Sequence, residues 1–185
     1  MIENIQRGER MDDLTQRIFR AMKLEPGLYE EVEADTGALN QAIIVVILSS
    51  LAAGLGSATR GIGILLGGTM IALLSWLIWA YLIYLIGTKL LPEPQTESNP
   101  KELLRVLGFA SAPGLIRILG IFHSLRMIIF AIAAIWSIMA MIIAVRQALD
   151  YTSTARAVGV CVIAFFIQLL ISAILISFMG VPVKT

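Results

Sequence analysis

Five long apolar runs, separated by polar connections, constrain the fold of this chain more than any other feature of its sequence. Each run is close in length to the roughly 20 residues that an α-helix needs to cross the hydrocarbon core of a bilayer. Hydrophobic residues make up 58% of the chain, which is more than a soluble domain of this length needs. We therefore predict an all-α integral membrane protein, a bundle of five transmembrane helices. The predicted spans are residues 38–56, 62–87, 103–122, 127–145 and 157–179.

The spans divide the chain into three parts. Residues 1–37 form a predicted cytoplasmic segment, residues 38–180 the transmembrane domain, and residues 181–185 a short tail. Apolar side chains recur at helical spacing near the N-terminus, opposite several arginines: Met11, Leu14, Ile18 and Met22. This pattern predicts an N-terminal amphipathic helix, which either lies on an anionic membrane surface or packs on a protein face.

The third apolar run differs from the others because it carries two arginines and a helix-breaking sequence. A straight helix would place Arg105 and Arg117 near opposite membrane interfaces, where each guanidinium reaches water along its own stem. The predicted break contains Ser111, Pro113 and Gly114. Proline lacks the backbone N–H that a helix needs, so a break in lipid requires cover from neighbouring helices. Two interpretations follow: a proline-kinked packing helix, or a discontinuous helix that lines a site.

Small residues at a spacing of four mark two candidate helix-packing faces. Gly63 and Gly67 form a Gly-x-x-x-Gly pair in the second span. Ala140 and Ala144 have the same spacing in the fourth span. Such pairs let another helix backbone approach closely, so we expect close helix contacts at these four positions.

The distribution of charged residues predicts the orientation of the chain in the membrane. If the N-terminus is cytoplasmic, only four of the 14 lysines and arginines lie on the outer side: Arg60, Arg117, Arg126 and Lys184. All 13 acidic residues then lie inside, and the outer connections have only a few residues each. The positive-inside rule therefore favours a multi-pass protein of the cell inner (plasma) membrane with a cytoplasmic N-terminus.

Charged side chains gather at the predicted cytoplasmic ends of the spans. The cluster combines acids before the first span with residues that flank the later ones: Glu30, Glu31, Glu33, Asp35, Arg105, Arg146, Asp150 and Arg156. A guanidinium beside hydrocarbon is costly unless it reaches water or a carboxylate. We therefore predict that the segment over residues 29–35 folds under the bundle and meets at least one of these arginines. The alternative is that all of these groups face lipid headgroups and water.

The sequence contains no pattern that predicts catalysis or a bound cofactor. No predicted span holds an aspartate, glutamate or histidine at membrane depth, as proton-coupled carriers usually do. His123 and Cys161 are the only residues of their kinds, and no Gly-x-Ser-x-Gly, His-Glu-x-x-His or Walker-type motif is present. We therefore predict a non-enzyme with no cofactor and no metal. The net charge of +1 predicts no nucleic-acid partner.

Four stretches together resemble the bacterial branch of the Yip family, the Ypt/Rab-interacting membrane proteins. They are residues 29–35 (YEEVEAD), Gln41-Ala42, residues 104–113 (LRVLGFASAP) and residues 145–157 (VRQALDYTSTARA). The resemblance covers residues 24–180 and implies five spans with a cytoplasmic N-terminus. Eukaryotic members bind Rab-type GTPases and one another. This chain lacks their long N-terminal region, and only Leu28-Tyr29 corresponds to their Asp-Leu-Tyr-Gly-type motif, so the resemblance gives little support to GTPase binding.

Two functions compete at this point. The first is a non-catalytic membrane organiser or complex subunit, which binds other proteins or a second copy of the chain within the lipid bilayer. The second is a permease or channel for a small solute, which would use the broken third helix. A polar cavity that reaches residues 111–114 is the observation that separates the two.

Overall fold

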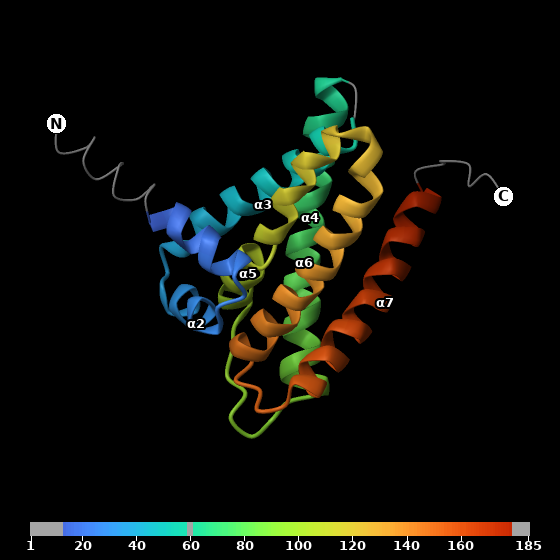
Figure 1. The fold of residues 1–185 in the computed structure, drawn as a ribbon. Helices are drawn as coiled ribbons and strands as arrows, with labels where there is room; N and C mark the ends of the chain where they lie inside the picture. Colours follow the sequence, from blue (N-terminus) through green and yellow to red (C-terminus); the bar gives the residue numbers. More distant parts are fainter. Residues whose placement is uncertain (1–12, 59–60, 179–185) are drawn as a thin grey trace.

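The structure, a computed structural model, describes residues 13–58 and 61–178, and these residues form helices without a strand (Figure 1). Residues 13–22 are helical. The elements that follow are α2 (Pro26–Ala34), α3 (Ala38–Gly56), α4 (Ile62–Leu85), η1 (Ile86–Leu90), α5 (Pro100–Phe109), η2 (Ala112–Ile121), η3 (His123–Leu125), α6 (Arg126–Ala148) and α7 (Thr154–Phe178). The π-helical turn η1 extends α4, while η2 and η3 have 3-10 geometry. Three residues used in the predictions lie outside the described ones: Met11, Arg60 and Lys184.

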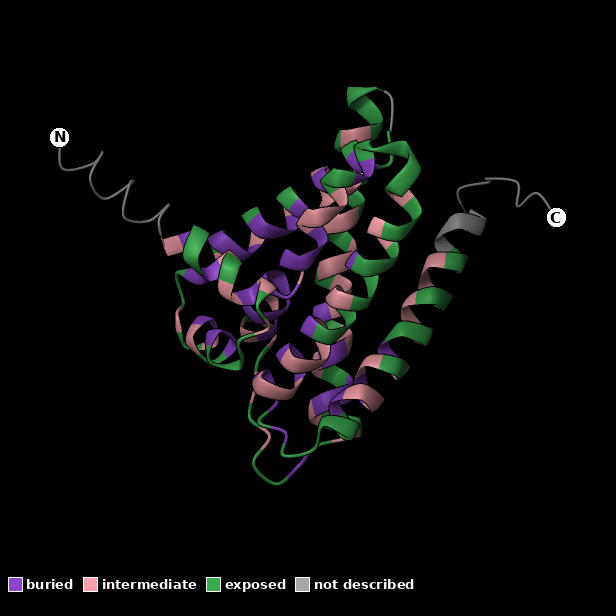
Figure 2. Cartoon of the chain, viewed as in Figure 1, coloured by how far each residue is buried: buried purple, intermediate pink, exposed green. Residues whose placement is uncertain are grey.

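Five helices in the described part of the chain are long and apolar enough to cross a membrane. They are Ala38–Gly56, Ile62–Leu90, Pro100–Ile121, His123–Ala148 and Thr154–Ile174. Large apolar side chains such as Ile71, Ile135 and Phe166 are exposed on α4, α6 and α7, as suits helices that face lipid (Figure 2). The prediction of an all-α membrane protein with five spanning helices is therefore confirmed.

The bundle has two unlike ends. We call the end formed by residues 91–99 and 149–153 the long-connection end, and the end formed by residues 57–58, 61 and 122–125 the short-connection end. The half of the bundle next to the long connections is a packed apolar core, whose members include Ile83, Leu103 and Val145 at 0% exposure. Because these side chains come from α4, α5 and α6, they join three spans at this end.

The third span changes its helical geometry partway along its length. The helix α5 begins with a capping box, in which Asn99 and Glu102 each bind the other's backbone N–H, and it ends at Phe109. The 3-10 helix η2 then continues from Ala112 to Ile121. The change falls at residues 110–111, just ahead of Pro113 and Gly114, which are buried inside η2. The hydroxyl of Ser49 donates to the Ser111 carbonyl over 2.7 Å, so α3 covers one polar group at this junction.

The described N-terminal residues pack against the bundle. Leu14 and Ala21, on the helix over residues 13–22, belong to the buried core. The indole N–H of Trp136 donates to the Met22 carbonyl over 2.8 Å, and Trp136 lies near the middle of α6 rather than at its end. The N-terminal helix and α2 therefore lie beside the spans (Figure 1). The hydrogen bond from Gln147 to Glu30 brings α2 toward the long-connection end, and a position of α2 under the bundle stays a prediction.

Two close backbone approaches in the bundle occur at glycines that the spacing rule did not single out. A Cβ on Gly56 would lie 1.7 Å from the Arg117 carbonyl oxygen, and one on Gly120 would lie 2.7 Å from the Gly56 oxygen. By contrast, a Cβ on Gly63 or Gly67 would meet nothing within 4 Å. Gly63 and Gly67 thus face away from the described chain, so their role in helix packing stays a prediction. Ala140 and Ala144 are fully buried.

Candidate functional site

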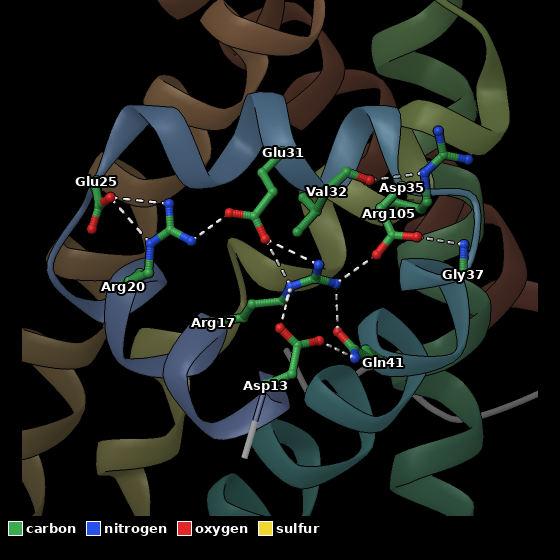
Figure 3. Close-up of polar contacts among 10 residues, drawn as sticks. All are labelled: Asp13, Arg17, Arg20, Glu25, Glu31, Val32, Asp35, Gly37, Gln41 and Arg105. Carbon is green, nitrogen blue, oxygen red and sulfur yellow. Dashed lines mark hydrogen bonds and ion pairs between the residues drawn. The ribbon is translucent and has the colours of Figure 1, made fainter. Parts of the chain in front are cut away.

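A cluster of ion pairs joins the N-terminal helix to α2 and α3, and we call it the Arg17 cluster (Figure 3). It consists of Asp13, Arg17, Arg20, Glu25, Glu31, Asp35 and Gln41. The Arg17 guanidinium donates to Glu31 over 3.0 Å, to Asp35 over 2.8 Å and to the Gln41 side-chain oxygen over 2.9 Å. Its side chain is only 11% exposed. Arg17 is therefore the buried centre of the cluster.

The charges of the Arg17 cluster reinforce one another. Burial alone would lower the pKa of Arg17, but its hydrogen bond to Asp35 and three nearby carboxylates raise that pKa above the usual value. The same hydrogen bond lowers the pKa of Asp35. Arg20 stands at the edge of the cluster, where it pairs with Glu25 and Glu31. These ion pairs hold the N-terminal helix and α2 together electrostatically.

Arg105 connects the third span to α2 through backbone carbonyls. Its guanidinium donates to the Val32 carbonyl over 2.9 Å and to the Glu33 carbonyl, and the residue is only 6% exposed. The last carbonyls of a helix have no partner within the helix and favour a cation. Arg105 therefore caps the C-terminal end of α2, so α2 does meet one of the predicted arginines, through its backbone rather than a carboxylate.

The other predicted cluster residues lie at the long-connection end and contact different partners. Arg156 approaches Glu93 to 3.4 Å and donates to the Pro92 carbonyl over 2.8 Å. Arg146 donates to the Tyr151 carbonyl over 3.2 Å. Among the described residues, no carboxylate of α2 contacts either arginine; Glu30 instead accepts from Gln147 over 2.6 Å. Asp150 is exposed and has a positive φ of 52°. The structure thus divides the predicted cluster between two separate groups.

Glu33 makes the stability of the protein depend on pH. The pKa of Glu33 is raised from 4.5 to about 7, chiefly by burial, with smaller contributions from the nearby Asp150, Glu102 and Glu30 and an opposing one from Arg105. Protonated Glu33 therefore contributes to the stability of the folded state. This contribution is complete below pH 4.5 and is lost as the pH rises through about 7. We expect the melting temperature to fall from pH 5 to pH 8, and Glu33→Gln to reduce that fall.

The control for this pH dependence is Glu97→Gln, which changes an exposed acid at the same end of the bundle. Melting curves of the purified chain in detergent, recorded in steps of pH, provide the measurement. If the melting temperature of Glu33→Gln falls with pH as steeply as that of the wild type, Glu33 is not the source of the pH dependence.

A cavity of about 830 Å³ lies among the spans, between α3, α4, the third span, α6 and α7. Seven serines contribute to its lining: Ser49, Ser50, Ser57, Ser75, Ser111, Ser137 and Ser172. Apolar side chains, including Trp76, Trp79 and Met141, form most of the remaining wall. The cavity reaches Ser111 at the junction of α5 and η2, whereas Pro113 and Gly114 lie outside its lining.

Several polar groups at this cavity have no partner within the described chain. The Trp76 N–H, the Ser137 hydroxyl and the Gln168 side-chain oxygen are buried without a hydrogen bond among the described residues. Arg117 also lines the cavity, and no hydrogen bond or ion pair is found for it within the described part of the protein. Buried polar groups in native proteins nearly always have partners, so this concentration marks the cavity as a candidate binding site.

The side chain of Arg117 turns back into the bundle. A Cβ on Gly114 would lie 3.2 Å from a terminal nitrogen of Arg117 and 3.5 Å from the Ser49 hydroxyl. The guanidinium therefore lies one turn of η2 deeper than its own backbone. The expectation that Arg117 would extend to the nearer interface is not met, because glycine at position 114 leaves room for the inward orientation.

Fold and spans together define a multi-pass, all-helical membrane protein. A comparison with protein families matches the Yip1 domain over residues 18–176. Because this match covers most of the chain, the protein belongs to the Yip1 domain family. The family is one of non-enzymatic membrane proteins, and the predicted lack of enzymatic activity is consistent with it. Comparisons with curated proteins and with solved structures found no match.

Proposed function

We propose that this protein is a membrane organiser or complex subunit of the bacterial branch of the Yip family, which binds other membrane or cytoplasmic proteins. The observation that carries the proposal is the pair of helices outside the spans, residues 13–22 and α2, which the Arg17 cluster and Arg105 fix to the bundle. On this fixed surface Phe19 is 60% exposed. Aromatic side chains dominate the energetics of protein interfaces, so Phe19 is the proposed anchor for a partner.

Cross-linking in native membranes, followed by capture of the full-length chain, tests the proposal. We expect a stoichiometric partner that is captured by the wild type and lost in Phe19→Ala, because the variant removes the exposed ring. Gln16→Ala is the matched control, since Gln16 is exposed on the same helix. A partner retained equally by both variants, or no stoichiometric partner at all, would contradict a binding role for this surface.

The proposed location is the bacterial inner membrane, with the N-terminus and the long-connection end in the cytoplasm. Cysteines placed at Gln95 and Ser124 test this orientation, since both positions are exposed and lie at opposite ends of the bundle. In a Cys161→Ala background, a membrane-impermeant maleimide applied to intact spheroplasts should label Ser124→Cys and leave Gln95→Cys unlabelled until the cells are lysed. The reverse pattern would place the N-terminus outside.

A permease for a small solute is the second candidate, because the cavity contacts Ser111 at the change of helical geometry in the third span. Flux through proteoliposomes tests this candidate. Under this alternative, Pro113→Ala would abolish flux of a solute while the protein still folds. Under the preferred proposal, the same variant would change only stability.

A further inference from the structure

We propose that the intramembrane cavity binds one anionic phospholipid, whose phosphate pairs with Arg117 and whose ester region and chain lie against the deeper wall. This inference goes beyond the proposed partner binding and does not depend on it. The size of the cavity suits a ligand: its volume of about 830 Å³ lies in the upper part of the range for small-molecule sites, roughly 300–1,000 Å³.

The charge at the cavity favours an anion. Arg117 turns its guanidinium inward against Gly114, and none of the described acidic residues lines the cavity. A guanidinium held among apolar helices is costly unless a counter-charge or water reaches it. A phosphate satisfies this requirement well, because the planar guanidinium donates two parallel hydrogen bonds to two phosphate oxygens.

The deeper wall favours a ligand with hydrogen-bonding groups next to an apolar body. Trp76 lies about 21 Å from the start of α4, at roughly 1.5 Å per residue, and so near the middle of the bundle. It offers an unpartnered donor, Ser137 an unpartnered hydroxyl and Gln168 an unpartnered acceptor. Ester oxygens and hydroxyl groups of a glycerolipid match these groups, while Trp79, Met141 and the surrounding aliphatic wall suit a hydrocarbon chain.

The position of the cavity among the spans favours a ligand that comes from the bilayer. Exposed Ser57 and Ile64 line it next to the short-connection end and mark its mouth. Trp79, which donates to the Met141 sulfur over 3.4 Å, lines it toward the long-connection end. The packed core of the long-connection half lies on that side. The surrounding bilayer is therefore the nearest source of a molecule that fills the cavity.

Native mass spectrometry of the full-length chain in detergent tests the inference with three probes. The probes are phosphatidylglycerol as the anionic lipid, phosphatidylcholine as the zwitterionic lipid, and glycerol phosphate as a water-soluble anion without a chain. We expect one tightly retained phosphatidylglycerol per chain, bound about tenfold or more tighter than phosphatidylcholine, since a charge-assisted pair is worth at least about one factor of ten. Glycerol phosphate should not compete at comparable concentration.

Two pairs of variants assign the retained lipid to the cavity. Arg117→Gln should weaken phosphatidylglycerol binding about tenfold or more, whereas Arg126→Gln removes an arginine at the same end that does not line the cavity. Gly68→Leu adds bulk at the cavity wall and should displace the lipid. Gly67→Leu is its matched control, because a Cβ at either glycine meets nothing within 4 Å and only Gly68 lines the cavity.

The outcomes separate clearly. Equal lipid retention by Arg117→Gln and Arg126→Gln, or by Gly68→Leu and Gly67→Leu, would overturn the proposed site. Equal binding of both lipids would overturn the role of the charge, and effective competition by glycerol phosphate would overturn the role of the chain. If Arg117→Gln fails to fold, the two glycine variants decide the assignment, since each keeps every charge of the protein.

Discussion

Gly56→Ala is expected to destabilise the folded protein by more than about 3 kcal/mol, which exceeds the usual cost of overpacking. Helix α3 packs more extensively against η2 than any other pair of described elements does. Within this contact, a Cβ on Gly56 would lie 1.7 Å from the Arg117 oxygen and 2.7 Å from its carbonyl carbon. Both atoms belong to the backbone, so no side-chain rotation can relieve the clash, and α3 must separate from η2.

Equilibrium unfolding in mixed detergent micelles measures this effect, and Gly54→Ala is the control. A Cβ on Gly54 would lie 2.4 Å from a terminal carbon of Leu65, which a flexible side chain can move. We therefore expect a loss of about 1 kcal/mol or less for Gly54→Ala, within the lower part of the usual range. Similar losses in both variants would mean that the α3–η2 approach is looser than the structure indicates.

This contrast explains why helix packing was only partly predictable from the sequence. The Gly-x-x-x-Gly spacing identifies small residues on one face of a helix, but it carries no information on whether another helix faces that side. Gly63 and Gly67 have the spacing and face away from the described chain, whereas Gly56 and Gly120 lie on different elements and meet across a helix pair. A pairwise approach of this kind depends on the arrangement of the spans, which no local pattern encodes.

The five spans could be predicted because the signal for each one is local in the sequence. A span is defined by its own length and apolar content, and both are local properties of the sequence. The partners of the charged residues are not local. Helical spacing placed Arg17 on the polar face of an amphipathic helix, and that face is covered by Glu31 and Asp35 of the following segment. Only the fold could show that Arg17 is buried and that Arg117 turns inward.

The Arg17 cluster supports the second large prediction. Arg17→Gln should destabilise the folded protein by about 2–3 kcal/mol, because it leaves the carboxylates of Asp13, Glu31 and Asp35 without their shared cation. Removal of one partner of a buried ion pair costs about 3–5 kcal/mol, and the smaller figure here reflects acids that remain about 40% exposed. Arg20→Gln, at the more exposed edge of the cluster, should cost less than about 1 kcal/mol.

A double-mutant cycle between Arg17→Gln and Asp35→Asn isolates the interaction from other effects of each substitution. The two side chains are 2.8 Å apart, so we expect a coupling free energy of about 1 kcal/mol or more in equilibrium unfolding. The same cycle for Glu33→Gln and Arg156→Gln should be additive, because Arg156 contacts Glu93 and Pro92 instead. Additive losses for Arg17 and Asp35 would show that this ion pair does not help to hold the N-terminal helix to the bundle. The position of Phe19 would then depend on the other contacts of that helix.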